Sequence, residues 1–315
     1  MAAKLRYPTG VRPLLAEETS RRRRIEQRFV ALLEGDGFAE VALPIIDYSD
    51  PYAALVDART SRQSYRFVDR EGDLVTVRSD FTPMLARALA PSLPTESLPL
   101  RLFYRGDVIR CEASRLGSNR ELFQIGAEIV GDGTIEADVR MMRTAAELIR
   151  QFGDKPSIVY TDVSVAAALA ALGPAIGPAL VSKRLAAADC ATLPPEARTL
   201  VEKLVAGTAT LEDLSSFAPT ATTAARLRAI GASLPSDQFA LHLDDVEEAG
   251  SYYSGLRFQV YAGASRTRVA QGGRYDRLYE RFGTAAPAIG FTFNIDDLDD
   301  RRSAPGGNST AEPRS

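Results

Sequence analysis

Several polar residues are spaced so that they could surround one small ligand. Gln124, Gly126 and Glu128 alternate in the segment 121–130, and in a strand all three would share one face. A glycine inside a strand often marks the close approach of another group. The pattern predicts either a polar platform for a ligand, made by an amide and a carboxylate, or a solvated sheet face with a bulge.

A second strand-like segment, 100–112, places Arg110 and Glu112 on one face. The guanidinium fork of Arg110 suits a carboxylate or a phosphate. It could equally form a structural ion pair with Glu112 or Glu128. The spacing alone leaves these alternatives open.

Asp80 and Thr82 follow the alternating segment 74–78 and share its parity with Arg78. An acid and a hydroxyl two residues apart can clamp an ammonium group. Asp-x-Thr-Pro is also an ordinary start of a helix, with the acid as N-cap, and the pattern by itself favours this second interpretation.

Aromatic and glycine-containing segments nearer the C-terminus are further candidates. Tyr252 and Tyr253 lead into the alternating strand 255–261. The segment 272–276, which includes Tyr275, is predicted to be a turn that enters a helix. Its two glycines could bring the backbone close to a ligand, or they could merely make the turn.

The composition excludes several classes of function. The chain has 315 residues and 45% apolar residues, which is typical of a globular protein with a sizeable core. Its net charge of −3, from 38 basic and 41 acidic residues, gives no global field that attracts nucleic acid or anionic membranes. One histidine, His242, and two cysteines, Cys111 and Cys190, are too few for a multi-histidine or Cys-based zinc site. No lysine follows a glycine and no G-x-G-x-x-G occurs, so P-loop and dinucleotide motifs are absent from the sequence. We therefore expect no cofactor and no metal.

The sequence also carries expectations about location. The N-terminus lacks the apolar segment of a secretory signal, and the two cysteines fit a reducing cytoplasm. The uncharged stretch 163–182 is long enough to be a membrane span, but it is mostly alanine and contains two Gly-Pro pairs. We predict two short buried helices there.

The elements that must position these residues alternate between strand-rich and helix-rich segments. Helices are predicted at about 17–33, 135–152 and 275–282, and strands at about 38–44, 74–78, 100–112, 121–130, 239–243, 255–261, 268–271 and 288–294. The segments 100–112 and 121–130 are predicted to pair antiparallel. A core at 1–300 would contain a helical insert at about 163–233 and precede a disordered tail at 301–315. This pattern predicts an α+β fold with an antiparallel sheet.

The ordered set of motifs resembles the core of the class II aminoacyl-tRNA synthetases, specifically the histidyl branch. Pro44 after a strand resembles the dimer-interface motif of that class, and 101–128 resembles its second motif, a strand–loop–strand. The segment 78–82 resembles the Arg-Pro-Glu-Gly-Thr segment of the branch, and 252–253 and 272–276 resemble its two histidine-specific motifs. The resemblance spans roughly residues 8–298 and implies an antiparallel sheet flanked by helices.

The resemblance also implies a histidine-binding site. In it, the first acid, the hydroxyl and the amide would hold the ammonium group of the ligand. The glutamate and the tyrosines would contact the imidazole ring, and the arginine would meet the carboxylate. The implied residues are Asp80, Thr82, Arg110, Gln124, Glu128, Tyr252, Tyr253 and Tyr275.

The departures from the synthetase pattern concern activation of the amino acid. Glu248 and Asp297 stand where the synthetase has arginines that contact the adenylate and the ATP phosphates. An acid at such a place repels a polyanion. Phe123 replaces the histidine before the second-motif glutamine, and no segment resembling the anticodon-binding domain follows residue 298.

A chain that keeps the amino-acid site but lacks the activation site resembles the regulatory subunits of ATP phosphoribosyltransferase, which are non-catalytic paralogues of the synthetase. The resemblance implies no catalytic residue in this chain. It implies L-histidine as ligand, the short-form catalytic subunit and a second copy of this chain as partners, and no nucleic acid or membrane. The alternatives are a histidyl-tRNA synthetase, a related amino-acid-activating paralogue, or a structural scaffold whose pocket binds nothing.

Overall fold

The structure is a computed structural model that describes residues 7–53, 55, 64–111, 119–186, 190, 192–246, 252–263 and 268–302, with side chains to residue 298. Glu112, Glu248 and most of the predicted tail lie outside the described residues. Within the described chain, no helix is both long and apolar enough to cross a membrane. The stretch 163–182 forms two short helices, α5 (Val163–Ala170) and α6 (Ile176–Ser182), as predicted.

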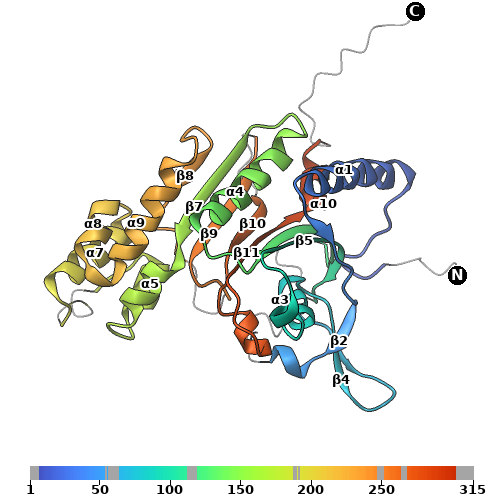
Figure 1. Ribbon diagram of the computed structural model, residues 1–315, viewed down its shortest axis with the longest axis horizontal. Helices are drawn as coiled ribbons and strands as arrows, with labels where there is room; N and C mark the ends of the chain where they lie inside the picture. The colour runs from blue at the N-terminus through green and yellow to red at the C-terminus, as the bar shows by residue number, and fades with distance from the viewer. Residues whose placement is uncertain are drawn as a thin grey trace, which may run out of the picture.

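A mixed sheet of eight strands in the described chain forms the centre of the molecule (Figure 1). In spatial order the strands are β1 (Ala39–Glu40), β5 (Leu100–Ile109), β6 (Glu121–Val130), β11 (Ala288–Asn294), β10 (Arg268–Arg274), β9 (Leu256–Ala262), β7 (Pro156–Asp162) and β8 (Phe239–Leu241). Both edge strands, β1 and β8, run parallel to their neighbours, whereas every inner pair is antiparallel. The predicted antiparallel sheet and the long β5–β6 pair are confirmed, with parallel edges in addition.

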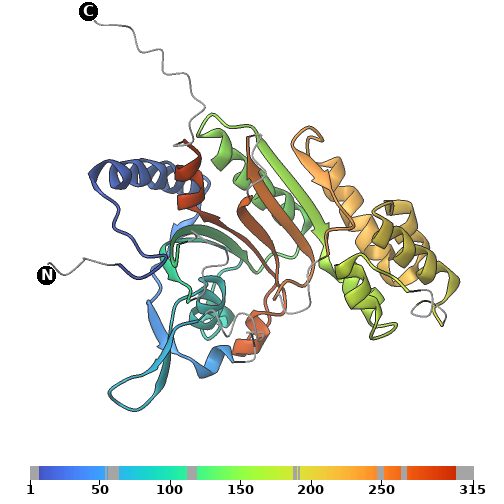
Figure 2. The ribbon, with the colours of Figure 1, turned by 180° about the vertical axis from the view of Figure 1, so that it is seen from behind.

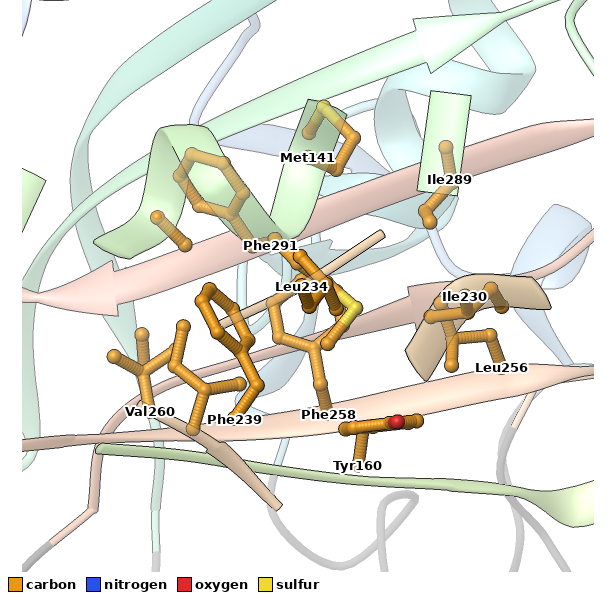
Figure 3. Close-up of a cluster of buried hydrophobic side chains, with 14 of the residues drawn as sticks. Met141, Tyr160, Ile230, Leu234, Phe239, Leu256, Phe258, Val260, Ile289 and Phe291 are labelled. Carbon is orange, nitrogen blue, oxygen red and sulfur yellow. The ribbon is translucent and has the colours of Figure 1, made fainter. Parts of the chain in front are cut away.

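The two faces of the sheet have different roles because side chains alternate along each strand. The helices α1 (Ala16–Gly35) and α4 (Ile135–Arg150) pack on one face, together with α10 (Ile295–Arg302) (Figures 1 and 2). The apolar side chains on this face form the main core, part of which is shown in Figure 3. The helix α3 (Thr82–Leu89) packs on the opposite face, against even-numbered residues of β5. That second face holds the site described below.

The described residues between β7 and β8 are mainly helical, as predicted for 163–233. They comprise α5, α6, α7 (Pro195–Ala206), α8 (Leu211–Ser216) and α9 (Ala218–Ala232), which extend beyond the edge of the sheet (Figure 1). One buried acid on α4 joins this insert to the sheet. Asp138 forms ion pairs with Arg226 of α9 and, at 2.7 Å, with Arg274 of β10.

A smaller sheet of three strands leaves apolar side chains exposed. Its order is β2 (Ile46–Tyr48), β4 (Leu74–Val77) and β3 (Arg66–Val68). Only β4 was predicted; β2 and β3 have three residues each, too few to show alternation. The exposed large apolar residues of this sheet are Ile46, Tyr48, Phe67, Val68 and Leu74.

Three local predictions differ from the structure. The predicted helix at 275–282 is only a 3₁₀ turn, η4 (Tyr279–Phe282), and Gly272–Arg274 are in β10 rather than in a turn. A Cβ on Gly272 would lie 2.4 Å from the carbonyl oxygen of Gly290, so the glycines permit close strand packing. The predicted strand 38–44 is reduced to β1, which ends before Pro44.

Two short 3₁₀ turns connect these elements. The 3₁₀ turns η1 (Asp50–Tyr52) and η2 (Leu93–Thr95) flank the small sheet and α3.

The sequence of β7 is rich in β-branched and aromatic residues but was not predicted as a strand. It pairs with β9 and β8, which extends the main sheet by one inner strand.

Candidate functional site

The polar face of the main sheet forms the floor of a small pocket. Cross-strand pairs align Glu128 with Gly290, and Gly126 with Thr292. The residues that line the pocket are Asp80, Thr82, Arg110, Gln124, Tyr252, Tyr253, Gln271, Tyr275, Gly290, Phe291 and Thr292. Seven of the eight candidates predicted from the sequence are among them, and Glu128 lies directly beneath. The structure therefore brings all eight together.

Glu128 is almost completely buried, with 1% of its surface exposed, as is Tyr275. Its Oε1 accepts hydrogen bonds from the hydroxyls of Thr82, at 2.8 Å, and Tyr104, at 2.9 Å. Its Oε2 has no partner among the described residues, and neither has the buried hydroxyl of Tyr275. Both unpartnered atoms adjoin Gly290, whose Cβ, if it had one, would lie 1.5 Å from Oε2 and 2.8 Å from the tyrosine oxygen.

The pKa of the Glu128 carboxyl is higher than that of an exposed glutamate. Burial raises its pKa to about 8, and the two hydroxyl donors only partly offset this effect. The nearby charge of Asp80 also raises the pKa. Glu128 is therefore largely neutral near pH 7 and has one oxygen left to bond with a ligand.

Asp80 both contacts the start of a helix and lines the pocket. Its Oδ1 accepts the backbone N–H of Thr82, at 3.1 Å, at the first turn of α3. Its Oδ2 accepts a hydrogen bond from the hydroxyl of Tyr252, at 3.3 Å, and the residue lines the pocket. Burial raises the pKa of Asp80, while the charge of Arg110 lowers it. One oxygen thus supports the helix start while the other faces the pocket.

Three tyrosines form an aromatic wall of the pocket. The rings of Tyr252 and Tyr253 are 5.1 Å apart, and the ring of Tyr275 meets that of Tyr252 edge-on at 5.7 Å. A Cβ on Gly273 would lie 2.8 Å from the ring of Tyr253, so this glycine makes room for the wall. The glycine pair of β10 therefore serves side-chain packing rather than a turn.

Arg110 is the cation that lines this pocket. Its Nε donates to the carbonyl oxygen of Ser79, at 3.4 Å, which holds it near Asp80. No ion pair between Arg110 and Glu128 is found in the described residues, so that structural alternative is wrong. Its other proposed partner, Glu112, lies outside the described residues.

Other expected features have structural roles instead. Arg78 donates to the carbonyl oxygens of Leu43, Pro44 and Asp107 and is not among the pocket residues. Gly126 admits the ring of Tyr104, which would lie 2.5 Å from a Cβ at this position. The close approach predicted at this glycine is thus made by a protein side chain. The alternative of a solvated, bulged face is wrong, because β5 and β6 pair in continuous register and this face is buried.

Five site residues were not predicted. These residues come together only through the pairing of strands. The sequence alone does not show which strands are neighbours. Tyr104 and Thr292 bond to each other at 3.0 Å beside Glu128. The unpredicted residues are Tyr104, Gln271, Gly290, Phe291 and Thr292.

The pocket is narrow in this conformation. Its cavity volume is about 30 Å³, which suffices for about two water molecules. A second cavity of about 150 Å³ adjoins it, and Asp80 and Tyr252 line both. An amino acid would therefore need more space than the pocket offers in this conformation. Elsewhere, no cluster of three or more His, Cys, Asp or Glu side chains that could bind a metal occurs in the described part of the chain.

Residues 10–298 match the family described as histidyl-tRNA synthetase. The chain belongs to this family. Its relatives include a protein of Moorella thermoacetica, 32% identical over 93% of this chain and 81% of the relative. A protein of Geobacter metallireducens is 32% identical over 91% of this chain and 71% of the relative. Both are named ATP phosphoribosyltransferase regulatory subunit. This name indicates a non-catalytic role despite the synthetase-like fold.

Solved structures agree on the fold. A structure from Bacillus halodurans, described as an ATP phosphoribosyltransferase regulatory subunit/histidyl-tRNA synthetase, matches with a TM-score of 0.81 at 23% identity, over 95% of this chain and 84% of its own. A histidine–tRNA ligase subunit from Alicyclobacillus acidocaldarius matches with a TM-score of 0.76 at 26% identity, over 96% of this chain and 99% of its own. The predicted class II synthetase-like fold is confirmed.

The structure describes two of the three positions that the resemblance linked to activation of the amino acid. Asp297 accepts a hydrogen bond from the side-chain amide of Asn294, at 3.1 Å, and so has a structural contact at the position where the resemblance implied a synthetase arginine. Phe123 packs under the guanidinium of Arg22, whose carbon lies 5.3 Å from the ring centre. The other changed position, Glu248, lies outside the described residues.

Proposed function

We propose that this chain is the regulatory subunit of an ATP phosphoribosyltransferase and that its pocket senses L-histidine. The observation that carries the proposal is the pair of unpartnered buried groups, Glu128 Oε2 and the Tyr275 hydroxyl, at the floor of the pocket. A buried polar group without a partner costs about 1–3 kcal/mol, so a ligand that pairs both is favoured. An imidazole ring offers two nitrogens, one for each group.

The charges at the pocket mouth suit the other end of an amino acid. Asp80 and Gln124 offer acceptor oxygens to an ammonium group, with Thr82 beside them. Arg110 offers its guanidinium to a carboxylate. A zwitterion with an imidazole side chain satisfies these groups together, whereas a nucleotide phosphate would face the acid Asp80.

A regulatory role requires a second site on a catalytic partner. The names of the relatives support a catalytic subunit of ATP phosphoribosyltransferase as that partner. We expect it to be the short form of that subunit. In this proposal the chain raises the activity of the partner, and histidine bound in the pocket lowers it. By linkage, substrates that favour the active state should then weaken histidine binding.

The proposed dimer contact is the segment around Pro44 and the small sheet that follows it. Ile45 and Ile46, directly after Pro44, are exposed, as are Tyr48 and Phe67 on the same sheet. Contiguous exposed apolar side chains are typical of an interaction surface. A second copy of this chain would cover them.

Calorimetric titration with L-histidine, combined with a pyrophosphate-exchange assay, tests the ligand and separates regulator from synthetase. We expect binding without exchange. Glu128→Gln should weaken binding by about 0.5–1.5 kcal/mol, because an amide replaces the neutral carboxyl that bonds to the imidazole ring. Glu26→Gln is the matched control, since this buried glutamate of α1 pairs with Arg105 away from the pocket. Robust exchange would favour a synthetase, and an unchanged Glu128→Gln isotherm would remove Glu128 from the site.

The partner is tested by measuring phosphoribosyl-ATP formation by the short catalytic subunit, with and without this chain, across a histidine titration. We expect the two proteins to co-elute as a hetero-oligomer and the rate to fall as histidine is added. Separate elution together with an unaffected rate would contradict the regulatory role.

A further inference from the structure

Three side chains connect the pocket to the first turn of α10. Gln124 lines the pocket and donates through Nε2 to Oδ1 of Asn294, at 2.8 Å. Asn294 is its direct cross-strand neighbour on β11 and donates in turn through Nδ2 to Oδ2 of Asp297, at 3.1 Å. The row therefore runs from the floor of the pocket to a carboxylate on the helix.

The direction of these bonds follows from the last member. A carboxylate has only acceptor oxygens, so Asn294 must turn its NH₂ group toward Asp297 and its oxygen toward Gln124. Gln124 must then use its own NH₂ group for Asn294. Its Oε1 is left as the group that it offers to the pocket. The acceptor at the end thus sets the polarity of two amides that would otherwise be free to flip.

We propose that Asp297 is a positioning residue for the ligand's ammonium group: through Asn294 it holds Gln124 with its carbonyl oxygen toward the pocket. This inference rests on the proposed function, because it assumes a ligand with an ammonium group. It gives the acid at this position a role within the amino-acid site, where the resemblance only implied the loss of an ATP contact.

The chain provides a matched control on the same helix. Asp296 precedes Asp297 and also lies in the first turn of α10, but it accepts the backbone N–H of Phe123, at 3.2 Å, and pairs with Arg22. Acids at either position favour the helix start. A role of Asp297 in helix capping alone would therefore change stability but would not distinguish one ligand from another.

The test compares L-histidine with imidazolepropionate, which lacks the amine, by calorimetric titration of four proteins: the wild type, Asp297→Asn, Asp297→Glu and Asp296→Asn. An asparagine can donate or accept, so Asp297→Asn lets both amides flip. We expect it to weaken L-histidine binding about fivefold, or about 1 kcal/mol, and to leave imidazolepropionate binding unchanged. Asp297→Glu keeps an acceptor-only group and should retain wild-type selectivity, as should Asp296→Asn.

Asp297→Lys is a stronger test. A lysine can only donate, so it should reverse the direction of both amide hydrogen bonds and weaken L-histidine binding further. Melting temperatures of all variants identify any that fail to fold. If the wild type binds L-histidine but both Asp297→Asn and Asp297→Lys lose the two ligands equally, or lose neither, the positioning role is wrong. A wild type that binds no L-histidine overturns the proposed function and this role with it.

Discussion

Two carboxylates are almost completely buried on the same sheet scaffold, yet their surroundings are opposite. Asp138 of α4 is 0% exposed and is paired on both oxygens, by Arg274 on one side and Arg226 on the other. Glu128 of β6 is 1% exposed, bonds only to hydroxyls through Oε1, and has no partner for Oε2 among the described residues. Burial is equal, and only the pairing differs.

The difference separates structure from binding. Buried polar groups in folded proteins are normally paired, and each exception requires an explanation. The ion pairs of Asp138 join three elements, α4, β10 and α9, and so attach the helical insert to the sheet. The free oxygen of Glu128 instead points to a group that the protein itself does not supply.

The largest effect is expected from removing the paired acid. Asp138→Ala removes the acid shared by two buried or half-buried arginines, of which Arg274 keeps only its pair with Asp276, and should lower the free energy of unfolding by about 3–5 kcal/mol. Urea denaturation measures this loss. The control is Glu147→Ala, which breaks an exposed pair with Arg150 and should cost at most about 1 kcal/mol. Equal losses in the two variants would show that the Asp138 pairs do not stabilise the fold.

The unpaired acid, Glu128, should make stability depend on pH. Because the pKa of Glu128 is about 8 in the folded chain, against about 4.5 when exposed, the folded state keeps a proton that the unfolded state releases. Stability should therefore fall as the pH rises from about 4.5 to about 8, by up to about 1.4 kcal/mol per pH unit from this group. Below this window the group contributes no loss, and above it the loss is complete.

Urea denaturation of wild type and Glu128→Gln at pH 5 and pH 8 isolates this contribution. The variant cannot ionise at this position, so it should gain stability relative to the wild type at the higher pH. A stability difference that is the same at both pH values would contradict the raised pKa. In that case Glu128 and Asp138 would differ in their partners, but the ionisation of Glu128 would not change the free energy of unfolding as proposed.

The sequence predicted much of the scaffold because its signals are local. The alternation in 121–130 correctly placed Gln124 and Glu128 on one face, and the alanine-rich insert is helical as expected. The wrongly predicted turn at 272–274 has a physical cause as well. A glycine pair favours a turn locally, whereas here Gly272 is required by the packing of neighbouring strands.

The candidate site was predicted less completely because it is assembled across strands. Taken singly, the candidate residues also fitted a purely structural role. Only their order along the chain, which resembles that of the synthetase core, predicted that they form one pocket. Tyr104, which bonds to Glu128, lies on a different strand and faces Gly126, a contact that depends on the register of β5 and β6. The network from Gln124 to Asp297 likewise depends on the pairing of β6 with β11.

The smallest effect is expected at the second unpartnered group. Tyr275→Phe removes a buried hydroxyl that bonds to nothing in the described chain, so the free energy of unfolding should stay level or rise. Histidine binding should weaken by about 0.5–1.5 kcal/mol, because the ring loses one hydrogen bond. Tyr261→Phe is the opposite control: its hydroxyl donates to Gln259 at 2.7 Å outside the pocket, so its loss should lower stability and leave binding unchanged. If Tyr275→Phe instead lowered stability and left the histidine isotherm unchanged, its hydroxyl would be a structural group like Asp138, and the distinction between paired and unpaired buried groups would fail at this site.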